Sequence, residues 1–165
     1  TMIYAFAEVK REIGNVRLHI MGDIDDGEYY EACRTLIEQL GVQDIIFTGS
    51  VDVAEYIKKL DFIILTSISE GQPLSVLEAF AAGRACVTTD VGCCRELIEG
   101  NDGLGEAGIC VPPMNKEQVA QAMLELCREP FTRKRMGAVG RDRVRKYYTH
   151  DISMENYKRL YQEVV

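Results

Sequence analysis

The sequence predicts an α/β fold, in which a parallel sheet of about five strands is covered by helices on both faces. Short apolar runs alternate along the chain with stretches whose apolar residues recur at helical spacing. Glycine closes several of the helical stretches, as at Gly14, Gly41 and Gly83. Strands that alternate with helices form βαβ units, so their strands run parallel.

Length and composition place the chain among globular domains. Its 165 residues are enough for one domain, and 47% hydrophobic and 27% charged residues are ordinary values for such a domain. The net charge of −7 argues against nucleic acid as a partner. No apolar run has the length of a membrane span and the start of the chain lacks a signal-peptide pattern, so a cytoplasmic location is expected.

The predicted strands are short apolar runs bounded by glycine or polar residues. They are Val16–Met21, Asp44–Phe47, Phe62–Leu65, Ala85–Thr88 and Ile109–Val111. His19 alternates with apolar neighbours in the first run, which favours packing on a sheet face over a catalytic role.

The predicted helices have apolar residues on one face and glycine, proline or a polar cap at their ends. They are Met2–Ile13, Glu28–Leu40, Val53–Leu60, Leu74–Gly83, a turn and short helix within Gly92–Ile98, Lys116–Arg128, Phe131–Tyr148 and Asp151–Val165. The glycine-rich stretch Gly103–Gly108 is predicted to be a loop before the last strand.

The central feature of the sequence is the strand–loop–helix segment Leu65–Gly83. Pro73 suits the first helical position, where its missing N–H is not needed. Ligands of open α/β sheets bind at the carboxyl ends of the strands, where this loop is expected to lie. The free N–H groups of a helix start can bind an anion, and Gly71 allows a ligand to approach the backbone closely.

Two glutamates of this segment, Glu70 and Glu78, are eight residues apart. Eight helical residues span about 12 Å, too far for the two carboxylates to act on one bond. The spacing suits a longer ligand, with a sugar at Glu70, a diphosphate at the helix start and a ribose at Glu78. The alternative is that Glu78 is an exposed helix residue and that Glu70 is a carboxylate favoured by the helix dipole.

The segment Glu70–Ala79, EGQPLSVLEA, resembles the E-x7-E segment of the family-4 retaining glycosyltransferases of GT-B fold. The likeness extends in order over nearly the whole chain. Further segments that resemble the family pattern are Ile20–Asp23, Phe47–Gly49, Asp61–Ser67, Val87–Glu96 and Gly108–Pro113.

The resemblance implies that residues 1–165 form the Rossmann-like, nucleotide-sugar-binding C-terminal domain of such an enzyme. It implies a catalytic role for Glu70 at the donor sugar and a ribose contact for Glu78. It places the diphosphate near Gly71, Gln72, Leu74 and Ser75, and the nucleobase near Gly22, Asp23, Gly49, Ser50 and Val51. The donor that it favours is a UDP-sugar, and it requires neither a metal nor another cofactor.

Two parts of the family pattern have no counterpart in this sequence. One is the acceptor-binding N-terminal domain. The other is the first strand of the C-terminal domain, with an Arg and a Lys that bind the donor diphosphate. A fragment without transferase activity of its own is therefore expected. In the family sheet, of order 3-2-1-4-5-6, that strand lies between Val16–Met21 and Phe62–Leu65. Because unpaired buried backbone groups are costly, these two strands are predicted to pair directly and to close the gap within one chain.

The sequence leaves three possible functions for the chain. The first is the donor-binding half of a retaining glycosyltransferase in exopolysaccharide synthesis, with the absent N-terminal domain and a membrane-associated synthase complex as partners. The second is a non-catalytic module that binds a nucleotide-sugar or phosphate, which would not need Glu70. The third is a nucleotide-sugar epimerase of the same architecture.

Two further features of the sequence allow different readings. The six cysteines lack disulfide and zinc-ligand spacing, so they are expected to be reduced thiols, with Cys93-Cys94 as an alternative redox-sensing pair. Eight basic residues lie within 128–146 against two acidic ones. A solvated helix face is the favoured interpretation, and a docking surface for a partner domain or an anionic membrane is the alternative.

Overall fold

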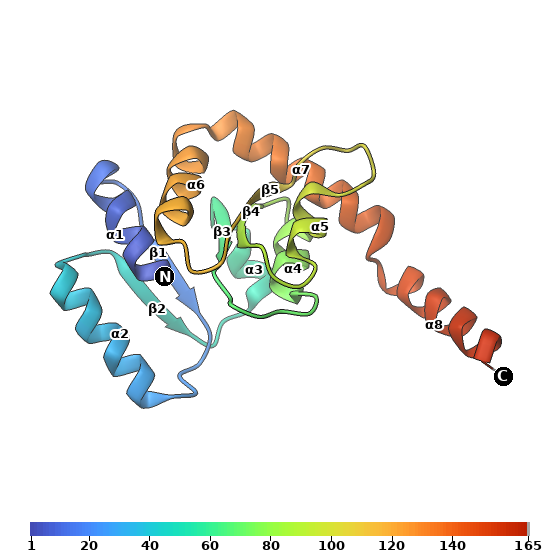
Figure 1. The fold of residues 1–165 in the computed structure, drawn as a ribbon, viewed down its shortest axis with the longest axis horizontal. Coiled ribbons are helices and arrows are strands. Elements are labelled where there is room, and N and C mark those ends of the chain that lie inside the picture. Colours follow the sequence, from blue (N-terminus) through green and yellow to red (C-terminus); the bar gives the residue numbers. More distant parts are fainter. Residues whose placement is uncertain (165) are drawn as a thin grey trace.

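The computed structural model describes residues 1–164 as five strands and eight helices (Figure 1). The strands are β1 (Leu18–Met21), β2 (Ile45–Gly49), β3 (Phe62–Leu65), β4 (Ala85–Thr89) and β5 (Gly108–Val111). The helices are α1 (Met2–Glu12), α2 (Gly27–Leu40), α3 (Val53–Ile57), α4 (Leu74–Ala81), α5 (Cys94–Glu99), α6 (Lys116–Arg128), α7 (Pro130–Tyr147) and α8 (His150–Val164). The predicted α/β class and the number of strands are confirmed; the predicted last residue of the final helix lies outside the described residues.

The strands form two parallel sheets. In the smaller sheet β1 pairs with β2, beginning at Leu18 and Ile45, and the register shifts before Met21 meets Gly49. In the larger sheet β4 lies between β3 and β5. All five residues of β4 are buried, which makes β4 the centre of the domain.

Two apolar cores cover the two faces of the strands. The first brings α1 and α6 against residues from both sheets, including Leu18 of β1 and Val87 of β4. The second packs α3, α4 and α5 against the other face, around Phe80 and Cys86. Helices on both faces are the Rossmann-like arrangement that the sequence predicts.

The prediction that β1 would pair directly with β3 is wrong. Each of these strands pairs on one side only, and a cleft of about 670 Å³ is lined by the facing residues Leu18–Met21 and Phe62–Leu65. Met2, Phe6 and Met123, from α1 and α6, also line this cleft, called the strand cleft below.

Two physical reasons explain why the strand cleft stays open. Residues of α1 and α6 belong to one core that includes Leu18 of β1 and Val87 of β4, so closing the gap would require these helices to repack. The prediction also assumed that the free strand edges are buried, whereas three of the four residues in each of β1 and β3 are partly exposed. Backbone groups that reach solvent do not pay the full desolvation penalty.

Helix α7 is fixed to α4 and β4 by close backbone contacts. A Cβ atom at Gly137 would lie 2.1 Å from the carbonyl oxygen of Gly83, and one at Gly140 would lie 2.6 Å from the Phe80 ring. Helix α8 extends away from the rest of the domain (Figure 1) and exposes several apolar side chains. These are Met154, Tyr157, Leu160 and Tyr161.

Candidate donor-binding site

The site begins where β3 ends, in the loop of residues 66–73 that leads into α4. Pro73 is buried at the N-cap rather than at the first helical position, and its ψ of 114° turns the chain into the helix. The side chains that follow, Leu74 and Ser75, are exposed, and so are Gly71 and Gln72 before it. The start of α4 is therefore open, and its first amides are accessible to an anion.

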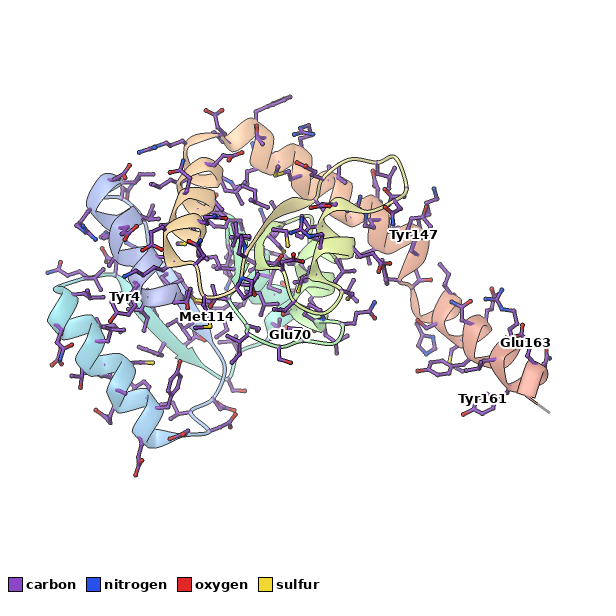
Figure 2. All side chains as sticks on the ribbon, in the orientation of Figure 1. Tyr4, Glu70, Met114, Tyr147, Tyr161 and Glu163 are labelled. Carbon is purple, nitrogen blue, oxygen red and sulfur yellow. The ribbon has the colours of Figure 1, made fainter. Side chains whose placement is uncertain are left out.

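Glu70 is held in place by a chain of hydrogen bonds that reaches the buried sheet. The Ser67 hydroxyl donates to Oε1 of Glu70 at 2.6 Å. The Ser67 carbonyl accepts a hydrogen bond of 2.6 Å from the hydroxyl of Thr89, a fully buried residue at the end of β4. Glu70, labelled in Figure 2, is partly exposed, and its carboxylate is thus oriented by contacts that reach two neighbouring strands.

The loop before α5 supports the backbone of the same segment. Gly92 has a φ of +54°, and a Cβ atom there would lie 2.3 Å from the carbonyl oxygen of Glu70 and 2.5 Å from that of Gly71. Cys93 donates its backbone N–H to the Gly71 carbonyl at 3.0 Å. Only glycine fits this contact, because a side chain would overlap the backbone and the φ is unfavourable for other residues.

Gln72 lies close enough to the Cys93 thiol to favour its charged form. Burial raises the pKa of this thiol and the negative Glu96 adds to the effect, whereas the hydrogen bonds oppose it. Cys93 is therefore protonated at neutral pH and acts here as a neutral side-chain neighbour of Gln72. All six cysteines are free, in agreement with the expectation of reduced thiols.

Glu78 lies on the exposed side of α4, four residues after its first residue. The helix rise puts it about 6 Å beyond Leu74 along the axis. Glu70 thus lies before the open helix start, and Glu78 lies about one helical turn after it. Their contacts to a donor stay predictions.

The residues predicted for the nucleobase lie at the ends of β1 and β2. Gly22 donates its N–H to the Gly49 carbonyl at 3.2 Å, and both glycines have positive φ, +129° and +65°. Asp23 and Ser50 beside them are exposed, and Val51 is partly buried. These turns therefore present mostly backbone and short polar groups.

The strand cleft connects the two halves of the predicted site. Met21 at the end of β1, Leu65 at the end of β3 and Ser75 at the start of α4 all line it. The carboxyl ends of β1 and β3 and the helix start therefore surround one space, as expected for an α/β sheet.

Reasoning from the sequence missed four residues that hold Glu70 and Gly71 in position. They are Ser67, Thr89, Gly92 and Cys93. Three of them lie far along the chain from Glu70, so no local pattern connects them to it. Gly92, after a strand and before a short helix, was the one available signal of a close backbone contact.

Residues 1–164 contain no group of three or more side chains that could hold a metal ion. No helix in this range is long and apolar enough to cross a membrane.

The chain matches a known family model over most of its length. Residues 1–129 match the family model for glycosyl transferases group 1. The chain belongs to this glycosyltransferase family. The resemblance to glycosyltransferases of GT-B fold seen in the sequence is thereby confirmed.

Several curated proteins are similar to this chain. It is 27% identical over 166 residues to N-acetyl-alpha-D-glucosaminyl L-malate synthase of Bacillus anthracis and 29% identical over 175 residues to alpha-monoglucosyldiacylglycerol synthase of Streptococcus pneumoniae. It is 30% identical over 168 residues to the exopolysaccharide phosphotransferase SCO2592 of Streptomyces coelicolor. The alignments cover 99%, 96% and 99% of this chain but only 42%, 37% and 17% of those proteins.

Solved glycosyltransferase structures have the same fold. TarM of Staphylococcus aureus, solved as a complex that includes UDP, superposes with a TM-score of 0.81 at 21% identity. HepE of Anabaena, solved with UDP-glucose, superposes with a TM-score of 0.81 at 18% identity. These superpositions cover 96% and 98% of this chain and 31% and 45% of the two structures.

Proposed function

We propose that this chain is the donor-binding C-terminal half of a retaining glycosyltransferase that uses a UDP-sugar. The observation that carries the proposal is Glu70, a partly exposed carboxylate oriented by Ser67 and Thr89 beside the open start of α4. Membership of glycosyl transferases group 1 supports it. The solved neighbours that contain UDP or UDP-glucose support the choice of nucleotide.

In this proposal four parts of the donor are bound by different residues of the site. Glu78 accepts hydrogen bonds from the ribose hydroxyls, and the first amides of α4, near Gly71, Gln72, Leu74 and Ser75, bind the diphosphate. Glu70 contacts the donor sugar and stabilises the positive charge that develops as the sugar leaves. The turns at Gly22 and Gly49, with Asp23, Ser50 and Val51, contact the base mainly through the backbone.

The remaining parts of the enzyme belong to the full-length protein. The acceptor domain and the missing first strand, with its Arg and Lys, would complete the diphosphate site, so the isolated chain is expected to be inactive. Exopolysaccharide is the proposed product class, because SISEGQPLSVLEAFAAG and TTDVGCCRELIEG resemble the Pel polysaccharide glycosyltransferase PelF. A cytoplasmic location in a membrane-associated synthase complex agrees with that class.

A non-catalytic nucleotide-sugar-binding module is the second candidate, and a nucleotide-sugar epimerase is the third. The hydrogen-bond chain from Thr89 to Glu70 favours the transferase, because a binding module has no need to orient a carboxylate at the sugar position. The test below separates the transferase from the binding module.

The test uses the full-length enzyme with a panel of nucleotide sugars. Glu78→Ala should weaken binding of the UDP part by about 10- to 150-fold, the loss typical of charge-assisted hydrogen bonds. Glu70→Ala should mainly lower kcat, with donor affinity nearly unchanged. Glu125→Ala, an exposed glutamate on α6, is the matched control and should change neither quantity. Donor binding without turnover in the unmodified enzyme would favour the binding module, and unchanged kinetics in both variants would refute the assignment.

A further inference from the structure

Helix α7 carries basic residues of two kinds. Three interact with groups of the domain itself. Arg143 is buried and Arg133 pairs with Asp61, and Arg128, just before the helix, pairs with Glu12. Five others are exposed, and within residues 1–164 none of the five forms an ion pair. They are Lys134, Arg135, Arg141, Arg145 and Lys146.

The five exposed cations share one side of the helix. At 100° per residue they occupy an arc of about 140°, and Phe131 lies near its middle. The opposite side, with Met136, Gly137 and Gly140, is buried against the domain. The Phe131 side chain is 80% exposed. The five cations and Phe131 are called the basic face below.

Charge within the domain does not explain the basic face. The chain has 26 acidic residues and a net charge of −7, yet Asp142 is the one acidic side chain on this arc. Arg141 and Arg145 are four residues apart on the helix, a spacing at which like charges repel. Some exposed cations elsewhere have acidic partners, as Arg95 has Asp90 and Glu99. Within residues 1–164, Arg17, Arg34 and Lys158 have none, so α7 is distinguished by the clustering of five unpaired cations on one arc of a helix. A cluster of unpaired cations is complementary to a negatively charged surface outside the molecule.

The shape of the basic face indicates which kind of negatively charged surface it can bind. Its 18-residue helix is about 27 Å long and lies along the domain with the basic face exposed, so it suits a flat partner rather than a groove. A bulky apolar side chain among the cations is typical of segments that lie at a lipid headgroup layer. Helix α7 lies along the upper side of the molecule (Figure 1), whereas Glu70 lies on the lower side (Figure 2), so this contact would leave the candidate site open.

We propose that the basic face docks the domain onto an anionic membrane surface, with the cations at the lipid phosphates and Phe131 in the headgroup layer. Clusters of four to eight Lys or Arg on a helix bind anionic lipids, and each cation strengthens binding about fivefold. This contact is peripheral, since the apolar side of α7 is occupied by the domain. It involves none of the residues assigned to the donor.

The test is co-sedimentation of the 165-residue chain with vesicles. Binding is expected to vesicles of equal parts phosphatidylglycerol and phosphatidylcholine and not to pure phosphatidylcholine, and it should fall as salt rises because the charges are exposed. Replacing Lys134, Arg135 and Arg145 by Glu should weaken binding at least about a hundredfold. Phe131→Ser should weaken it less, with the salt dependence retained.

The matched control removes the same charge from other surfaces. Arg17, Arg34 and Lys158 are exposed, and replacing all three by Glu gives the same net charge as the α7 variant. This control should bind the anionic vesicles as the unmodified chain does. Thermal unfolding should show that both triple variants remain folded. Absence of binding by the unmodified chain, or an equal loss in the control, would overturn the proposal and favour a protein partner or a solvated face.

Discussion

The two sheets of this domain are built differently, although the candidate site uses both. In the larger sheet every residue of β4 is buried, and in the smaller sheet only Leu18 is. Helix α2, which follows β1, has no buried residue at all. The predicted sugar and diphosphate contacts therefore lie on the densely packed half, and the predicted base contacts lie on the more exposed half.

The space around the glycines also differs between the half of the domain with the larger sheet and the half with the smaller sheet. In the larger half a Cβ atom at Gly92 or Gly108 would lie 2.3 or 2.0 Å from a backbone oxygen. In the smaller half a Cβ atom at Gly22 or Gly49 would meet nothing within 4 Å, although both residues have positive φ. The first pair is required by close packing and the second by backbone conformation alone.

The largest difference between the halves is expected in the free energy of unfolding, when one cation that stabilises each half is replaced. Arg143, 2% exposed, donates to both oxygens of Asp102 and to the carbonyls of Leu97, Ile98, Glu99 and Gly105. Lys10 makes the corresponding contacts in the smaller half, donating to Asp44 and to the carbonyls of Gly14 and Val16. Its side chain is 17% exposed.

Arg143→Met should lower the free energy of unfolding by about 3–5 kcal/mol, since it leaves a buried carboxylate and several carbonyls unpaired. Lys10→Met should lower it by about 1 kcal/mol, because solvent replaces the lost hydrogen bonds. Arg145→Met, on the exposed side of α7, is the control and should change it by less than about 0.5 kcal/mol. Chemical denaturation measures all three. Equal losses for Arg143 and Lys10 would mean that the halves do not differ in this way.

A smaller effect is expected at Gly92. Gly92→Ala should lower the free energy of unfolding by about 1–3 kcal/mol and displace the Glu70–Gly71 backbone, so the full-length enzyme should lose donor affinity. Gly103→Ala is the matched control, because Gly103 has a φ of +72° but empty space around it. It should show only backbone strain, about 1 kcal/mol, with donor affinity unchanged. Similar donor affinity in both variants would contradict a role for the Gly92 contact in the site.

The smallest effect concerns acid stability. Hydrogen bonds from Arg143 lower the pKa of Asp102 to about 2, and Lys10 lowers the pKa of Asp44. A carboxylate with a depressed pKa stabilises the fold above its unfolded pKa, near 4, and this stability is lost as the pH falls toward the folded value. Asp102→Asn should therefore be less stable at neutral pH but should lose less stability between about pH 4 and pH 2. A variant with the same acid profile as the unmodified chain would contradict this linkage.

Local patterns in the sequence were sufficient for most elements of the fold. β3 and α6 begin and end at the predicted residues, because an apolar run and an amphipathic face are encoded within the segment itself. The two separate sheets could not be predicted in this way. They depend on contacts of α1 and α6 with both sheets, which join residues more than sixty positions apart.

The candidate site shows the same limit. The predicted residues Glu70, Gly71 and Ser75 do surround the start of α4, because they belong to one continuous segment. The contacts that orient them come from Thr89 and Gly92, on the next strand and its following loop. Such contacts depend on the order of the strands in the sheet, and the spacing of apolar residues along the sequence does not specify that order.

The open edges of β1 and β3 have a consequence for how molecules of this chain behave in concentrated solution. Unpaired strand edges can pair with a neighbouring molecule, and charged side chains protect against this. The amino end of the strand cleft has such charges, Arg17, Asp61 and Arg133, whereas its carboxyl end is lined by Met21 and Leu65. Self-association is therefore expected to start at the carboxyl end, beside Ser75, where an aggregated neighbour would cover the start of α4.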